Sequence, residues 1–141
     1  MMRILIVDDR PDQRLLLMSA LSLAGHEALK ADSVMDALDL LNIDRRFDVI
    51  ISDLRMPKMN GVQFLEAVKV RYPRIPVIIV SACSKSDRGY ELLEKGAFAY
   101  LEKPFHVPEL LRVIEEATSL AHQVEYPFPE LRGLEELVFA V

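Results

Sequence analysis

The sequence contains little of what a secreted or membrane-inserted protein needs. Cys83 is the only cysteine among 141 residues, so no disulfide bond can form within the chain, and a reducing compartment fits. The N-terminal apolar run, Ile4 to Val7, is too short for a signal peptide or a membrane-spanning helix. We therefore expect a soluble cytoplasmic protein that does not associate with a membrane.

Positive charge and glycine are also scarce. The chain has 17 lysine and arginine residues against 22 aspartate and glutamate residues, which gives a formal net charge of −5. Proteins that bind a nucleic-acid backbone need a clustered excess of positive charge, so we expect this chain itself to bind no nucleic acid. The five glycines include no Gly-x-Gly-x-x-Gly pattern, which argues against a dinucleotide-binding fold.

Short apolar runs alternate with longer amphipathic stretches five times along the chain. The runs 4–7, 49–51 and 77–80 are apolar on both faces, as in strands that helices cover on both sides. The less apolar runs, 28–31 and 98–101, are expected nearer the sheet edges. This alternation predicts an α/β fold, with a parallel, doubly wound sheet between helices. The expected helices begin at Pro11 and after the capping residue Ser33, and cover 62–72, 87–95 and 108–121, with Gly25 and Gly96 as stop signals.

Polar residues cluster where the predicted strands end. Asp8 and Asp9 follow the first strand, Asp53 the third, Ser81 the fourth and Lys103 the fifth. Each residue alone has a simpler interpretation, because acids after strands are usually caps or turn residues, hydroxyls there serve turns, and lysines are usually solvated. Ligands of open α/β sheets, however, bind at the carboxyl ends of the strands. The convergence of five such residues at one edge favours a functional site.

Three neighbouring carboxylates limit the chemistry of this site. They repel one another, and one would have to take up a proton unless a cation lies among them. Carboxylate oxygens suit a hard cation such as Mg²⁺, which also binds phosphate oxygens. A carboxylate can itself be a nucleophile that forms an aspartyl phosphate, and a lysine can neutralise charge on the transferring group.

Four segments together resemble the receiver domain of two-component response regulators. They are ILIVDD at 4–9, DLRMPKMNG at 53–61, SA at 81–82 and GAFAYLEKPF at 96–105. The resemblance covers about residues 2 to 122 and implies a flavodoxin-like fold with five parallel strands in the order 2-1-3-4-5. It also implies a phosphoacceptor regulatory domain in a phosphorelay rather than an enzyme.

The resemblance assigns roles at the acidic cluster. Asp53 would be the phosphoacceptor. Asp9 would bind Mg²⁺ directly, Asp8 would bind it through water, and the backbone carbonyl of Arg55 would complete the ligands that the protein provides.

Further roles follow from the same resemblance. Lys103 would pair with one phosphoryl oxygen and Ser81 with another, and the Lys103–Pro104 peptide bond would be cis. Tyr100 would be the switch aromatic, although a strand residue with a solvated hydroxyl is the simpler alternative. Arg55 and Cys83 match variable positions that flank the phosphate, and Arg55 pointing into solvent stays an open alternative.

The implied partners are a sensor histidine kinase or a histidine phosphotransfer protein, which would supply the phosphoryl group. Phosphorylation would change the face formed by the fourth helix, the fifth strand and the fifth helix, which would control an output domain or partner. The same face would serve a homodimer.

The motifs at 53–57 and 96–101 resemble the receivers of nitrogen-regulation-type activators. We expect no counterpart of the ATPase and DNA-binding domains of such activators within these residues, because the sequence has no Walker phosphate loop and no room for a helix-turn-helix after Ala121. We expect a receiver domain at 1–122, either stand-alone or part of something longer, and a linker or tail at 123–141. The apolar spacing of Leu131 to Val138 predicts a short helix that docks on the domain or a partner chain.

Two alternatives and one local feature complete the sequence-based picture. A hydrolase of the haloacid-dehalogenase type needs Asp-x-Asp after the first strand, whereas Asp8 and Asp9 are followed by Arg10 and Pro11. A degenerate receiver that acts without phosphorylation is disfavoured, because all the acids, the hydroxyl and the lysine are present. Gly61 follows an asparagine and predicts a turn with unusual backbone angles.

Overall fold

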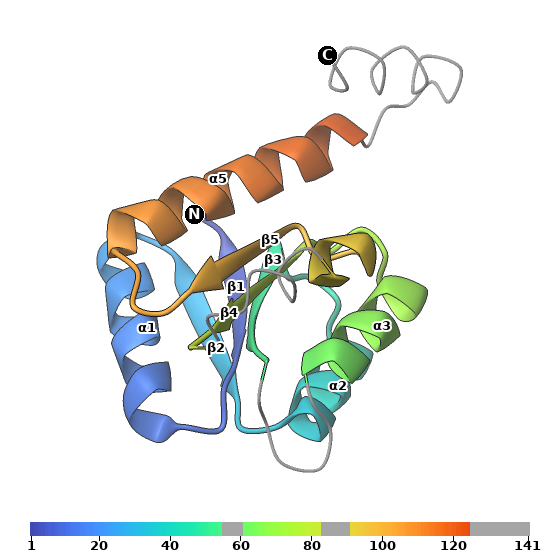
Figure 1. Cartoon of the computed structure of the whole chain (residues 1–141), viewed down its shortest axis with the longest axis horizontal. Helices are drawn as coiled ribbons and strands as arrows, with labels where there is room; N and C mark the ends of the chain where they lie inside the picture. Colours follow the sequence, from blue (N-terminus) through green and yellow to red (C-terminus); the bar gives the residue numbers. More distant parts are fainter. Residues whose placement is uncertain (55–60, 83–90, 125–141) are drawn as a thin grey trace.

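The computed structural model describes residues 1–54, 61–82 and 91–124, and of residues 120–124 only the backbone. Strands and helices alternate, as predicted (Figure 1). The strands are β1 (Arg3–Val7), β2 (Glu27–Ala31), β3 (Val49–Asp53), β4 (Val77–Ser81) and β5 (Ala99–Glu102). The helices are α1 (Pro11–Leu23), α2 (Val34–Ile43), α3 (Gly61–Arg71) and α5 (Val107–Val124), and residues 91–94 are also helical.

All neighbouring strands pair in parallel, and the sheet order is β2-β1-β3-β4-β5. This confirms both the predicted order and the predicted edge positions of the two less apolar strands. The three central strands are buried on both faces, while β2 and β5 contain exposed and half-buried residues. A strand with neighbours on both sides and helices above and below has no contact with water, which explains its continuous apolar sequence.

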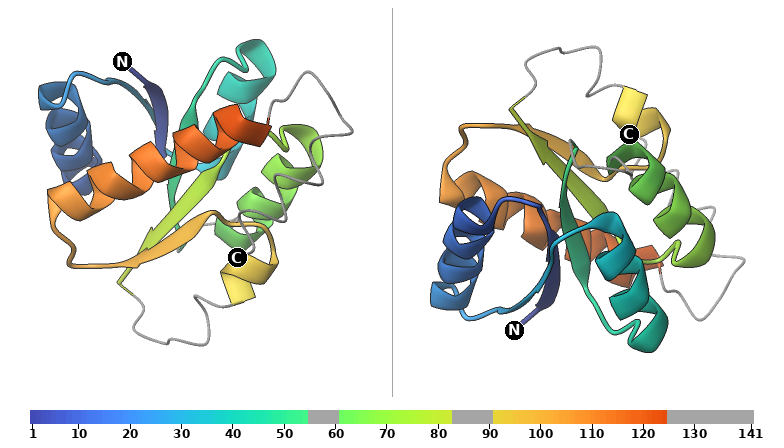
Figure 2. Two further views of the ribbon diagram at one scale, coloured as in Figure 1. Left: turned by 90° about the horizontal axis from the view of Figure 1, so that it is seen from above. Right: turned by 90° about the horizontal axis from the view of Figure 1, so that it is seen from below.

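Two separate hydrophobic cores lie on the two faces of the sheet. Successive residues of a strand point to opposite faces, so Ile4 and Ile6 belong to one core while Leu5 and Val7 belong to the other. Helices α1 and α5 cover the first core, and α2 and α3 cover the second (Figure 2). Both faces are therefore closed, and the strand ends remain the place where polar side chains can gather.

Local signals set several helix boundaries. Ser33 caps α2 as predicted, because its hydroxyl oxygen accepts a hydrogen bond of 3.1 Å from the Asp36 amide. Gly25 and Gly96 follow helices with φ angles of +89° and +107°, a left-handed conformation that glycine adopts without steric cost.

Some boundaries differ from the prediction. Helix α5 extends to Val124, three residues beyond the predicted end at Ala121, because the residues between them include no proline or glycine that would stop a helix. The predicted fourth helix is described only at 91–94, and the predicted tail helix lies outside the described residues.

Within the described part of the chain, no helix combines the length and the apolar composition needed to cross a membrane.

The cap of α2 generates a first prediction. Replacing Ser33 with alanine removes the acceptor for the Asp36 amide and should lower the free energy of unfolding by about 1 kcal/mol. Urea unfolding followed by circular dichroism measures this loss. Ser22→Ala, at an exposed position inside α1, is the matched control and should be neutral or slightly stabilising, since alanine favours helix interiors. Equal effects of the two changes would contradict the capping role.

Candidate functional site

Three carboxylates meet at the carboxyl edge of the sheet. Asp8 and Asp9 follow β1, and Asp53 is the last residue of the neighbouring strand β3. One side-chain oxygen from each residue lies within 4.8 Å of the others. Asp8 and Asp53 are almost completely buried, with 1% and 4% of their surface exposed, and Asp9 is half-buried. The predicted convergence of these acids is thus confirmed.

The Asp8 carboxylate is held in place at a high electrostatic cost. Its Oδ1 accepts a hydrogen bond of 2.9 Å from the Arg10 amide. Burial raises the pKa of the Asp8 carboxyl above its ordinary value, and the charges of Asp53 and Asp9 add to the increase. The Arg10 hydrogen bond and the Lys103 ammonium act in the opposite direction without cancelling it. The site therefore favours the arrival of positive charge.

Two oxygens of the cluster fit a cation directly. Asp8 Oδ2 and Asp9 Oδ1 are buried and find no hydrogen-bond partner within the described part of the chain. A buried carboxylate oxygen left without a partner is costly, and carboxylate oxygens at such spacing are the ligands that Mg²⁺ prefers. The residues at this edge therefore fit a hard divalent cation.

The Asp53 carboxyl group has a fixed orientation. Its Oδ1 accepts a hydrogen bond of 2.7 Å from the amide of the next residue, Leu54. The Ser52 hydroxyl donates a 2.9 Å hydrogen bond to the backbone carbonyl of Asp53. Side chain and main chain are thus both held at the strand end.

Gly61 is required by close packing rather than by turn geometry, which corrects the prediction. It is the first residue of α3, and it is absent from the glycines with positive φ among the described residues. Its amide donates a 2.8 Å hydrogen bond to the Leu54 carbonyl. A Cβ atom here would lie 2.5 Å from the Asp53 carbonyl oxygen. Only glycine lets α3 begin directly against the end of β3.

Lys103 reaches the cluster from the end of β5. Its Nζ lies 3.7 Å from Asp8 Oδ2 and donates a 2.6 Å hydrogen bond to Gln13 Oε1. Its backbone amide donates to the carbonyl of Ser81, which joins the ends of β4 and β5. The Lys103–Pro104 peptide bond is cis, as the resemblance implied.

The remaining predicted residues have mixed outcomes. Ser81, the last residue of β4, is buried at the same edge of the sheet. Tyr100 is half-buried and packs against the core that α2 and α3 cover. Arg55 and Cys83 lie outside the described residues, so the predictions for their roles stay predictions.

Two functional candidates on α1 were missed by the sequence analysis. Gln13 contacts Lys103, and Arg14 donates a 2.8 Å hydrogen bond to the Asp8 carbonyl and pairs with Asp32 at 3.0 Å. The position of Arg14 carries a signal that could have been used, because it falls on the buried stripe of Leu17 and Leu21 at helical spacing. A buried charged residue needs a hydrogen-bond or ion-pair partner. No comparable signal marks Gln13.

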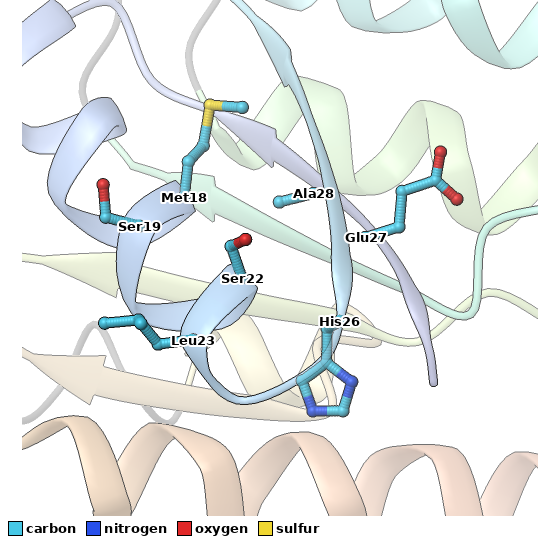
Figure 3. Close-up of a pocket in the computed structure, with 7 residues that line it drawn as sticks. All are labelled: Met18, Ser19, Ser22, Leu23, His26, Glu27 and Ala28. Carbon is cyan, nitrogen blue, oxygen red and sulfur yellow. The ribbon is translucent and has the colours of Figure 1, made fainter.

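A surface cavity of about 650 Å³ lies elsewhere, between the C-terminal half of α1 and the start of β2 (Figure 3). Parallel strands start at one edge of a sheet and end at the other, so this cavity is remote from the acidic cluster. Its lining residues include Met18, Leu23 and His26. It contributes no residue to the site.

Comparison with known proteins connects this geometry to one family. The profile of the response regulator receiver domain family matches residues 4–115. The DNA-binding transcriptional regulator NtrC of Klebsiella pneumoniae is 38% identical over 122 residues, which are 86% of this chain and 26% of that protein. The chain thus spans about a quarter of the length of the curated relatives it matches.

Solved structures agree with this match. The crystal structure of a response regulator receiver domain protein from Clostridium thermocellum superposes with a TM-score of 0.84 at 29% identity, covering 88% of this chain and 99% of that one. The solution structure of the beryllofluoride-activated NtrC4 receiver domain dimer gives a TM-score of 0.80 at 30% identity, covering 86% and 99%.

The raised pKa of Asp8 generates a second prediction. Asp8→Asn keeps an acceptor for the Arg10 amide and removes one buried negative charge. Without divalent cations at pH 7, it should raise the free energy of unfolding by on the order of 1 kcal/mol. With Mg²⁺ added, the wild-type protein should gain more stability than the variant, because the cation binds only the folded state and the variant lacks one ligand charge.

The pH dependence checks the cause. The ordinary pKa of the Asp8 carboxyl is 3.8 and the folded protein raises it, so the folded state holds the proton more strongly than the unfolded chain does. The contribution of Asp8 to the free energy of unfolding should therefore fall as the pH rises from 3.8 through the raised pKa of the folded state. The advantage of Asp8→Asn should be small below pH 3.8 and grow towards neutrality. An advantage that does not change with pH would contradict this explanation.

Proposed function

Because this chain belongs to the response regulator receiver domain family, we propose that it takes part in phosphorelay signalling by accepting a phosphoryl group on Asp53, with the help of Mg²⁺. The observation that carries the proposal is the cluster of three carboxylates within 4.8 Å, two of whose buried oxygens accept no hydrogen bond in the described part of the chain. Such a cluster is a poor structural element and a good cation site.

Mg²⁺ would be held by Asp8, Asp9 and Asp53. The backbone carbonyl of Arg55, which the family resemblance adds, lies outside the described residues. When bound, the cation supplies positive charge that offsets the three carboxylates and the charge of a phosphoryl group.

The phosphoryl group would come from a phosphohistidine of a sensor histidine kinase or a histidine phosphotransfer protein. A carboxylate oxygen of Asp53 attacks the phosphorus atom, and an O–P bond forms while the N–P bond breaks. The electron pair of that bond stays on the imidazole nitrogen. Because the attacking group is a carboxylate, no proton leaves it in this step. Leu54 holds the carboxylate oriented through its amide.

Lys103 and Ser81 would stabilise the transferred group. The ammonium of Lys103 is already at the cluster, and the buried Ser81 lies at the carboxyl end of β4, at the same edge of the sheet. Each would bind one phosphoryl oxygen, which places positive charge or a hydroxyl donor where negative charge accumulates.

Phosphorylation would then change the surface around the outer strand β5. Ser81 would turn towards the phosphoryl group and Tyr100 would move with it, which changes the face of the fourth helix, β5 and α5. Support comes from topology, because β4 and β5 are neighbours and the Lys103 amide bonds to the Ser81 carbonyl. The same face would form a homodimer, and one solved relative is described as an activated receiver domain dimer.

The chain would act as a regulatory domain rather than as an enzyme with its own substrate. We propose residues 1–122 as the receiver domain and 123–141 as a linker or tail. The curated relatives include DNA-binding transcriptional regulators, so the proposed output is the control of transcription by another domain or partner. The predicted cytoplasmic location fits this role and stays a prediction.

Phosphorylation at Asp53 is the third prediction. Incubation with acetyl phosphate and Mg²⁺ should add the mass of one phosphoryl group, which base should release. Asp53→Asn, of the same shape, should gain none, whereas Asp12→Asn, at an exposed acid in the first turn of α1, should label like the wild type. A chelator should prevent labelling. Base-labile phosphate on the Asp53→Asn protein would show that another residue is the acceptor.

Switching through Ser81 is the fourth prediction. Ser81→Ala should still be phosphorylated but should shift less towards the activated form, because a ligand biases an equilibrium only through contacts that differ between the two states. The measurement is the change in amide NMR shifts of β5 and α5 on phosphorylation, which we expect to fall to about half or less of the wild-type change. Asp53→Asn treated with the same donor supplies the baseline. Equal changes in Ser81→Ala and in the wild type would argue against the switch.

A further inference from the structure

Gln13 makes the closest contact to the Lys103 ammonium that the structure records. Its Oε1 lies 2.6 Å from Lys103 Nζ, across a sequence separation of 90 residues. An ammonium has three donors and no acceptor, so the amide must face it through its oxygen. The contact comes from the first turn of α1, in which Pro11 is the first residue and Gln13 the third.

Contacts of Arg14 hold the first turn of α1 in place. Arg14, the next residue, is buried, donates to the Asp8 carbonyl at 2.8 Å and pairs with Asp32 at 3.0 Å. These bonds anchor the helix start to the loops after β1 and β2. Gln13 therefore extends from a backbone that is held in place, and its amide fixes the end of the long and otherwise adaptable lysine side chain.

Gln13 and Asp8 hold the ammonium between them in unequal ways. Asp8 Oδ2 attracts it by charge at 3.7 Å, beyond hydrogen-bond distance, while the neutral Gln13 binds it at 2.6 Å. A neutral acceptor orients the ammonium without cancelling its charge. It also keeps the ammonium from closing on Asp8 Oδ2, an oxygen with no hydrogen-bond partner in the described ranges that a cation would use.

We propose that Gln13 is a positioning residue, which keeps the Lys103 ammonium ready for an incoming phosphoryl group and away from the cation-binding oxygen of Asp8. The proposal rests on the proposed function, since it assumes phosphoryl transfer to Asp53 beside a divalent cation. It assigns Gln13 no contact with the reacting atoms. Its effect passes through Lys103.

Two substitutions of similar length should act in opposite directions on cation affinity. Gln13→Met removes the acceptor, so the ammonium should move towards Asp8 and weaken Mg²⁺ binding by about threefold. Gln13→Glu holds the ammonium by charge and adds a fourth carboxylate, so it should strengthen Mg²⁺ binding by a similar factor. Both should slow phosphorylation by acetyl phosphate by about three- to tenfold, the first by displacing the ammonium and the second by neutralising it.

The measurements separate positioning from a structural role. Mg²⁺ affinity is followed by amide NMR titration, the phosphorylation rate by intact mass, and the Lys103 ammonium by its own ¹⁵N signal, which should be visible in the wild type and lost through exchange with water in Gln13→Met. Ser19→Glu, exposed on the same helix, controls for net charge and should behave like the wild type. In a Lys103→Met background, Gln13→Met should have no further effect.

The proposal is overturned if Gln13→Met and Gln13→Glu shift Mg²⁺ affinity in the same direction or leave it unchanged. It is also overturned if Gln13→Met acts equally with and without Lys103. A wild-type protein that binds Mg²⁺ but gains no phosphoryl group on Asp53 would refute the proposed function instead, while the affinity and ¹⁵N measurements would still decide whether Gln13 positions Lys103.

Discussion

Repulsion among three carboxylates is the constraint on which the rest of this structure depends. Asp8, Asp9 and Asp53 bring their oxygens within 4.8 Å of one another at a buried edge, and burial together with the neighbouring charges raises the pKa of Asp8. A fold that needed only stability would not gather these groups. The cluster therefore attracts positive charge. One lysine offsets part of its negative charge, and a divalent cation would offset more.

The surrounding architecture holds this unfavourable cluster in place. The strands of the sheet bury two separate hydrophobic cores. The free energy gained by burying this apolar surface offsets the electrostatic cost of the clustered carboxylates. Close packing then sets the position of the acceptor. Gly61 lets α3 begin against the Asp53 carbonyl, and Leu54 both orients the Asp53 side chain and accepts from the Gly61 amide. A functional site supported by packed backbone keeps its geometry.

Helix α1 contributes to the site through contacts that the sequence analysis did not predict. In its first turn, Arg14 donates a hydrogen bond to the Asp8 carbonyl, and Gln13 accepts one from Lys103, which lies 90 residues further along the chain. The result connects the ends of β1 and β5, which are not neighbours in the sheet. Positive charge at the site thus depends on the helix as well as on the strands that deliver the acids.

The sequence by itself determined the alternation of strands and helices, the edge positions of the two less apolar strands and the convergence of the acids. These features are encoded locally, because apolar periodicity reports burial and the ends of parallel strands share one edge. The Ser33 cap and the Gly96 stop are likewise signals within a few residues. The resemblance of the motifs to receiver domains supplied the strand order, which local patterns do not contain.

Tertiary structure alone decided the contacts between distant segments. The pairing of Gln13 with Lys103 spans 90 residues, and the need for glycine at position 61 comes from a backbone carbonyl across the β3–α3 junction. Neither leaves a periodic trace in the sequence. A hydrogen bond or a close approach depends on where two segments of the backbone meet in space. A periodic sequence pattern indicates only which residues of one element face the core.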